Sequence, residues 1–178
     1  MKLKFSLSAL ALLVLLPASS AFAAATSVGV DVARGQSDSM AYSLRLAQKY
    51  QPWVENSLFE LGPTAEIGGH AWVDDKDSVD TVWGAYLSPG VHFTLHTDAP
   101  VRPFISANVG GALNSEDHMD DRDFGSNLLF RTRGTVGVSF GEDYRHSIQG
   151  SYTHFSTWGI ANTDDGYSTY GMSYNFSF

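Results

Sequence analysis

Apolar and polar side chains alternate with a period of two along most of this chain, and helical spacing of apolar residues is scarce. The alternation is clear in 40–47 and 167–178, and clearest in 128–140, LLFRTRGTVGVSF. Successive side chains of a strand point to opposite sides, so each segment predicts a strand with one apolar face. In 128–140 the apolar face carries Leu128, Phe130, Val136, Val138 and Phe140, and the other face carries Arg131, Arg133, Thr135, Gly137 and Ser139.

Eight such segments are separated by turn-forming residues. The connections after the odd-numbered segments are mostly long and acidic, such as NSEDHMDDRDF at 114–124, whereas TDAP (97–100) and GED (141–143) are short. Long connections at one end, short turns at the other and an even strand count are typical of bacterial membrane barrels. The predicted strands are 26–34, 38–50, 57–72, 79–96, 101–113, 125–140, 144–157 and 167–178.

Two all-β folds accommodate this alternation. A β-sandwich would bury the apolar faces between two sheets, whereas a membrane barrel would turn them to lipid and fill its lumen with small and polar groups. Arg45, Glu66 and Arg131 fall on polar faces, where charges of both signs could pair inside a lumen. The strand count, the one-sided acidity and the aromatic last strand ending in Phe178 favour the barrel. We therefore predict an all-β fold, an eight-stranded antiparallel transmembrane β-barrel.

The first 23 residues have the features of a secretory signal peptide. Lys2 and Lys4 precede an apolar run at 7–16 that is too short to span a bilayer, and small residues at 21 and 23 mark a cleavage site. We expect cleavage after Ala23, so that residues 24–178 form the barrel. The chain has no cysteine, which excludes disulfides, and its formal net charge of −8 argues against nucleic acid as a partner.

His154 and Ser156 lie two residues apart in the seventh predicted strand. They share parity with Ile148 and Tyr152, so the strand predicts that both side chains face lipid. A serine hydroxyl becomes an effective nucleophile when an imidazole takes its proton, and this spacing brings the two groups near each other. A His and a Ser at this spacing also arise by chance, and polar residues there can mark the edge of a lipid-facing band. The pair alone leaves both interpretations open.

The surrounding segment, THFSTWGIANTDDGYS at 153–168, resembles the signature of the PagL-type lipid A 3-O-deacylases, and 101–113 and 123–141 resemble that family's fifth and sixth strands. The resemblance implies a Gram-negative outer membrane enzyme that hydrolyses an ester-linked 3-hydroxyacyl chain of lipid A, in lipopolysaccharide, with no cofactor or metal. It assigns Ser156 as the nucleophile and His154 as the base that later protonates the leaving hydroxyl. The positions that match the signature are His154, Ser156, Gly159, Ile160, Asp165 and Gly166.

Two positions depart from the family pattern. The acidic third member of the family's triad falls on Ser168, which can accept a hydrogen bond but supplies no charge; Asp164 and Asp165 in the adjoining loop are the other candidates for that role. The Asn of the family's oxyanion hole falls on Thr157, whose hydroxyl could still donate together with the backbone N–H of Gly159. A catalytically inactive barrel with a surface-interaction or structural role is therefore the alternative function. The sequence leaves a homodimer open.

Two further features bear on the ends of the predicted barrel. The run SEDHMDDRD at 115–123 could bind a divalent cation, but it lacks the spacing of a calcium loop and is more typical of a solvated outer loop. The tryptophans fall near strand ends, where the interfacial aromatic girdles of barrels lie, and all of them are expected to be anchors there. They are Trp53, Trp72, Trp83 and Trp158.

Overall fold

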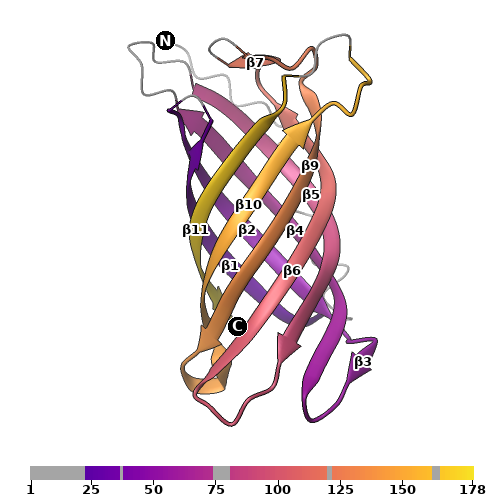
Figure 1. The fold of residues 1–178 in the computed structure, drawn as a ribbon, viewed down its shortest axis with the longest axis vertical. Helices are drawn as coiled ribbons and strands as arrows, with labels where there is room; N and C mark the ends of the chain where they lie inside the picture. The colour runs from indigo at the N-terminus through magenta and orange to yellow at the C-terminus, as the bar shows by residue number, and fades with distance from the viewer. Residues whose placement is uncertain (1–22, 37, 74–80, 120–121, 162–164) are drawn as a thin grey trace.

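The computed structural model describes residues 23–36, 38–73, 81–119, 122–161 and 165–178, which form an antiparallel β-barrel (Figure 1). Each barrel strand pairs with the next one along the chain, and the last strand pairs with the first. The eight barrel strands are β1 (Ala23–Gly35), β2 (Met40–Tyr50), β4 (Phe59–Val73), β5 (Thr81–Leu95), β6 (Val101–Asn114), β9 (Leu128–Phe140), β10 (His146–Ser156) and β11 (Tyr167–Ser177).

The predicted fold class is confirmed, because each predicted strand overlaps one barrel strand and differs from it only by a few residues at its ends. Closure follows from the pairing of β1 with both β2 and β11: Val30 lies opposite Leu44 on one side and Tyr174 on the other. A closed ring leaves no unpaired strand edge, which is the condition for strands to lie in lipid. The described residues include no helix that is long and apolar enough to span a membrane.

The two ends of the barrel carry different connections, as the sequence predicts. The connection between β6 and β9 contains a short hairpin, β7 (His118–Met119) and β8 (Arg122–Asp123), at the same end as the connection between β10 and β11 (Figure 1). At the opposite end, a 3₁₀ turn, η2 (Glu142–Tyr144), joins β9 to β10, and β3 (Val54–Glu55) pairs with the start of β4.

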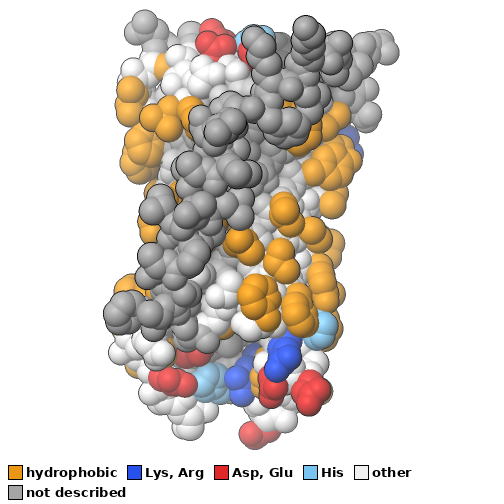
Figure 2. Space-filling view, turned by 180° about the vertical axis from the view of Figure 1, so that it is seen from behind, with side chains coloured by type: hydrophobic (Ala, Val, Ile, Leu, Met, Phe, Trp, Pro, Cys, Tyr) orange, Lys and Arg blue, Asp and Glu red, His pale blue; other side chains and the backbone are white. Residues whose placement is uncertain are grey.

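Side chains alternate across the barrel wall as predicted. Leu44, Val136 and Met172 point outward and are 59%, 63% and 65% exposed, whereas Arg45 and Arg131, on the opposite parity, are buried inside. Figure 2 shows hydrophobic side chains along the wall, with charged and histidine side chains toward the two ends, most of them at the lower end. An apolar outer band around a polar interior is the arrangement of a barrel that faces lipid.

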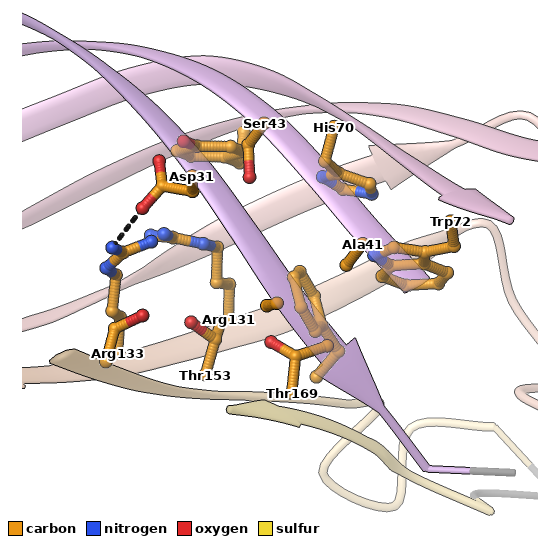
Figure 3. Close-up of a pocket in the computed structure, with 13 residues that line it drawn as sticks. Asp31, Ala41, Ser43, His70, Trp72, Arg131, Arg133, Thr153 and Thr169 are labelled. Carbon is orange, nitrogen blue, oxygen red and sulfur yellow. Dashed lines mark hydrogen bonds and ion pairs between the residues drawn. The ribbon is translucent and has the colours of Figure 1, made fainter. Parts of the chain in front are cut away.

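Charged side chains of both signs pair inside the lumen. Asp31 accepts a hydrogen bond of 2.5 Å from Arg133, drawn in Figure 3, and lies 3.5 Å from Arg45. Glu66 lies 3.3 Å from both Arg45 and Arg131. All five side chains are buried, and buried charges are tolerated when each has a partner. The network ties β1, β2, β4 and β9 together across the lumen.

Aromatic rings fill the lumen toward the loop end. Trp72 is the centre of this group, which we call the aromatic plug: Trp72, Phe124, Phe155 and Tyr167. The expectation that Trp72 anchors at the membrane surface is wrong, since the side chain is 1% exposed and points inward from β4. Parity, not nearness to a strand end, decides where it points. Trp53, Trp83 and Trp158 are 63%, 64% and 67% exposed.

The interior between the aromatic plug and the ion pairs is nearly full. A cavity of about 20 Å³, room for a single water molecule, lies between them and is lined by residues such as Asp31, His70 and Arg133 (Figure 3). Eight strands enclose a space that side chains just fill, so the part of the lumen lined by the described residues offers no room for a substrate.

The ion-pair network predicts a stability change. Replacing Glu66→Gln leaves Arg45 and Arg131 without their shared carboxylate, and we expect the free energy of unfolding to fall by about 3 kcal/mol. Urea titration followed by the heat-modifiable mobility of the barrel on gels measures this change. Glu116→Gln, the same replacement at an exposed loop position, should stay within about 0.5 kcal/mol of wild type. Equal stability of the two variants would contradict the account of the lumen.

Candidate active site

The candidate site lies on the outer surface of the barrel, at the end where β10 and β11 reach their connection. His154 on β10 pairs with Thr132 on β9 and with Ser168 on β11. Ile148 and Tyr152, which share its parity, are 43% and 42% exposed on the outer face. His154 is half-buried among these outward side chains of β10. The imidazole therefore belongs to the outer surface and not to the lumen.

Ser156 is the last residue of β10 and lies opposite Phe130 of β9. The Phe130 ring stacks on Trp158, with the ring centroids 4.8 Å apart. Ser156 keeps the outward parity of His154, yet it is only 7% exposed. The serine thus lies beside an aromatic pair instead of on the open barrel wall.

The His154 imidazole is held by a neighbouring strand. Its Nδ1 lies 2.9 Å from the Ser168 hydroxyl, directly across the ladder from β10 to β11. The same hydroxyl lies 3.1 Å from the phenolic oxygen of Tyr152. With Nδ1 donating to Ser168, Nε2 is the nitrogen that can take a proton, as a general base requires. The sequence indicated only that Tyr152 faces outward. Nothing in the spacing of Tyr152 predicts its contact with Ser168.

A tight turn follows Ser156. The N–H of Ile160 donates to the carbonyl of Thr157 at 3.1 Å, and both central residues are left-handed, with φ of 53° at Trp158 and 76° at Gly159. Two positive φ values define a mirror-image turn, which favours glycine at its second central position. Thr157 is 1% exposed, whereas Gly159 is exposed. Both oxyanion candidates therefore belong to this turn, Thr157 as its first residue and Gly159 as its third.

The aromatic plug supports the site from inside. Phe155 points into the lumen between the outward His154 and Ser156, and its ring lies 4.9 Å from that of Trp72. Tyr167 does the same beside Ser168, 4.5 Å from Trp72, and its hydroxyl lies 2.7 Å from that of Ser39. Packed inward neighbours restrict the rotation of the strands, so the outward side chains are held in place.

Asp165 is the one loop carboxylate proposed as a third triad member that lies within the described residues. The Asp165 carboxylate accepts a hydrogen bond of 2.9 Å from the backbone N–H of Asp123, on β8. Arg122 donates to the carbonyls of Asp165 and Gly166 at 3.0 and 2.9 Å, which fastens this loop to the hairpin. Asp164 lies outside the described residues. Of the described candidates, Ser168 is the one that hydrogen-bonds to His154.

Gly166 lies against the imidazole. Its φ is 51°, and a Cβ placed on it would come within 3.2 Å of His154 Cε1. Glycine is therefore favoured here both by the backbone conformation and by the close approach of the ring.

Two groups of residues could in principle hold a cation. In the acidic run, His118 lies 3.0 Å from Asp117, and this hydrogen bond lowers the pKa of the Asp117 carboxyl. Within the described ranges, Glu55, Glu60 and His96 offer three ligand atoms within 4.8 Å of one another. They lie at the end of the barrel opposite Ser156, and Glu60 already pairs with other side chains there. Neither group belongs to the candidate site.

Comparison with known proteins points in one direction. A family model described as lipid A 3-O-deacylase (PagL) matches residues 39–177, a range that contains His154, Ser156 and Ser168. The lipid A deacylase PagL of Pseudomonas aeruginosa is 29% identical over 175 residues, which cover 98% of this chain and 98% of that protein.

Solved structures show the same fold. The crystal structure of the outer membrane enzyme PagL superposes with a TM-score of 0.75 at 24% identity, covering 84% of this chain and 98% of that one. Neisserial surface protein A superposes with a TM-score of 0.56 at 15% identity, covering 86% and 96%. The N-terminal barrel domain of Pseudomonas aeruginosa OprF gives 0.52 at 14%, covering 88% and 99%. These likenesses support the barrel architecture.

The outward position of His154 can be measured in a membrane. The chain has no cysteine, so a spin label on a His154→Cys variant is unique. We expect its collision rate with oxygen, which concentrates in lipid, to be several-fold higher than that of a label on Thr153→Cys, because Thr153 points inward and is 4% exposed. Labels on Ile148→Cys and Gln149→Cys give the reference collision rates for an outward and an inward position on the same strand. Equal rates at 153 and 154 would contradict the assigned parity.

Proposed function

Because the chain belongs to the PagL family of lipid A 3-O-deacylases, whose model matches residues 39–177, we propose that His154 and Ser156 hydrolyse an ester-linked 3-hydroxyacyl chain of lipid A. The protein is an outer membrane β-barrel, and lipid A forms the outer leaflet of that membrane. The observation that carries the proposal is the outward-facing His154, held through Nδ1 by Ser168 and two residues from Ser156. A site on the outer wall meets its lipid substrate without removing it from the bilayer.

The proposed reaction begins with Ser156. Its Oγ attacks the ester carbonyl of the acyl chain while Nε2 of His154 takes the hydroxyl proton, and the carbonyl becomes a tetrahedral oxyanion. The intermediate collapses, the bond to the sugar oxygen breaks, and His154 returns the proton to that leaving oxygen. Water then attacks the acyl-Ser156 ester, again with His154 as base, and releases the 3-hydroxy fatty acid.

The oxyanion needs hydrogen-bond donors that are already in position. We assign this role to the Thr157 hydroxyl and the backbone N–H of Gly159, because both residues belong to the turn that follows Ser156. Removing one such donor typically costs about 10²–10³ in rate. The Phe130–Trp158 pair lies beside Ser156 and offers an apolar surface to the acyl chain.

The third member of the proposed triad is Ser168. When its oxygen accepts from Nδ1–H of His154, Nε2 is the ring nitrogen that is left free to act as a base. A triad carboxylate both orients the imidazole and stabilises the imidazolium with its charge. A hydroxyl carries no full charge, so Ser168 by itself can only orient the ring.

Lipid A mass spectrometry tests the proposal. Expression of the wild-type chain in a Gram-negative host that lacks the activity should give lipid A lighter by one 3-hydroxyacyl chain. Ser156→Ala should reduce this conversion by about 10³-fold or more, since the nucleophile is lost. Ser151→Ala, on the same strand with the opposite parity, should retain it. Unmodified lipid A from a wild-type barrel that is folded in the outer membrane would reject the enzyme in favour of a non-catalytic barrel.

We also propose that residues 1–23 are removed as a signal peptide during export. The short charged start, the apolar run and the small residues at 21 and 23 support this assignment. Intact-mass measurement of protein purified from outer membranes should give a chain that begins at Ala24. A mature protein that retains Met1 would disprove the assignment.

A further inference from the structure

Three polar side chains on the outer wall form one hydrogen-bonded row. Tyr152, Ser168 and His154 are linked in that order, with 3.1 Å between the phenolic oxygen and the Ser168 hydroxyl and 2.9 Å from that hydroxyl to Nδ1. Each of the three lies on the outward parity of its strand. The row ends at the imidazole that the proposed function uses as a base.

Strand register creates this row. His154 lies directly opposite Ser168, and Tyr152 lies opposite Tyr170 two pairs further along the same two strands. Diagonal neighbours of an antiparallel pair lie within reach of a long side chain, so the Tyr152 phenol can reach Ser168. The rings of Tyr152 and Tyr170 lie 4.9 Å apart on the outer face.

Ser168 by itself is a poor replacement for a carboxylate. It is 5% exposed, so water cannot easily strengthen its hydrogen bond to the imidazole. When Nδ1–H donates to the Ser168 oxygen, the serine hydroxyl proton is free to donate onward to the Tyr152 oxygen. Hydrogen bonds in such a chain polarise one another, which raises the negative partial charge on the oxygen that faces the imidazolium.

We propose that Tyr152 is a positioning residue for the deacylation reaction, acting through Ser168 to orient His154 and to stabilise its protonated form. This inference rests on the proposed function of His154 and Ser156. The Tyr152–Ser168 pair thereby performs, with two neutral hydroxyls, part of the role that the family's pattern gives to one acid.

The other described neighbours of His154 do not provide a charge to its ring. Thr132 faces it from β9 and Gly166 from the loop, and both are neutral. In the same loop, the Asp165 carboxylate accepts the N–H of Asp123, and Arg122 donates to backbone carbonyls. Within the described residues, the hydrogen bond to Nδ1 therefore leads to Ser168 and Tyr152.

Steady-state kinetics of the purified full-length barrel in detergent, with lipid A as the substrate, test the proposal. Tyr152→Phe keeps the ring and removes only the hydroxyl. We expect kcat to fall about tenfold with KM within twofold of wild type, the effect of weakening one hydrogen bond to a charged group. Tyr170→Phe is the matched control, because it removes a hydroxyl from the adjacent exposed ring and should leave kcat unchanged.

Variants of Ser168 test whether Tyr152 acts on His154 through Ser168, which we call the relay, or only makes a structural contact. Ser168→Ala should lower kcat at least as much as Tyr152→Phe, and the double variant should be no slower than Ser168→Ala alone, since Tyr152 acts through Ser168. Ser168→Glu restores a carboxylate at this position. In that background, Tyr152→Phe should have less than a twofold effect.

The pH dependence of kcat/KM gives a second readout. Activity should rise with pH as His154 loses its proton, which forms the acid limb of the profile. In Tyr152→Phe and Ser168→Ala this limb should move to lower pH, by up to about one unit, because the protonated imidazole loses support. In Ser168→Glu it should move to higher pH. A contact that only stiffens the wall would leave the limb in place.

The outcomes distinguish this inference from the function on which it rests. If Ser156→Ala abolishes deacylation while Tyr152→Phe keeps the wild-type kcat and acid limb, the relay is wrong and the proposed function stands. If Ser156→Ala is as active as wild type, the proposed function fails and the relay fails with it. Heat-modifiable mobility verifies that each variant is folded, and Ser168→Ala decides the matter if Tyr152→Phe does not fold.

Discussion

The hydrocarbon core of a membrane contains no water to bond with backbone amides and carbonyls, and this constraint determines the rest of the structure. Strands satisfy it only when each one is paired on both sides, which here requires β1 to bond to β2 and to β11. A closed wall one residue thick has two faces, so every second side chain meets lipid and the others meet the lumen. The sequence alternation, the apolar outer band and the buried ion pairs are consequences of that closure.

The same constraint explains why the candidate site is on the outside. The lumen is occupied by the Asp31–Arg133 and Glu66–Arg131 pairs and by the aromatic plug, so a lipid cannot enter it. His154 faces outward while Phe155 anchors the same strand inward against Trp72. The packed interior therefore serves as a rigid support for the outer surface that carries the candidate site. For an enzyme of lipid A, this is the side on which the substrate lies.

Most of the fold could be predicted from the sequence because parity is a local property. Alternation put Arg45, Arg131 and Arg133 on the polar faces of their strands, and the barrel prediction turned those faces to a lumen, where the three side chains pair with acids. It also gave the eight strands to within a few residues. The position of Trp72 was predicted wrongly because its nearness to a strand end was given more weight than its inward parity. No property of a single strand could have shown that Phe124, from a distant connection, packs against that ring.

The candidate site was less predictable because it depends on register between strands. The family resemblance already linked His154 with position 168, and the two residues do lie opposite each other. The contact of Ser168 with Tyr152, however, depends on the exact register of β10 with β11. Likewise, Asp165 is adjacent to the site in sequence, yet its carboxylate bonds to Asp123, more than forty residues away. The way in which the strands and loops pack together determines such contacts. The spacing of residues along one strand does not predict them.

The central claim is that Ser156, with His154 as its base, is a nucleophile presented to the membrane. The most direct measurement is covalent labelling of the folded barrel in detergent with a long-chain alkyl fluorophosphonate, which reacts with activated serines, followed by peptide mass mapping. The account predicts one adduct, on the peptide that contains Ser156, and its loss in a His154→Ala barrel that remains folded. A folded wild-type barrel that forms no adduct, or forms it at another serine, would contradict the claim.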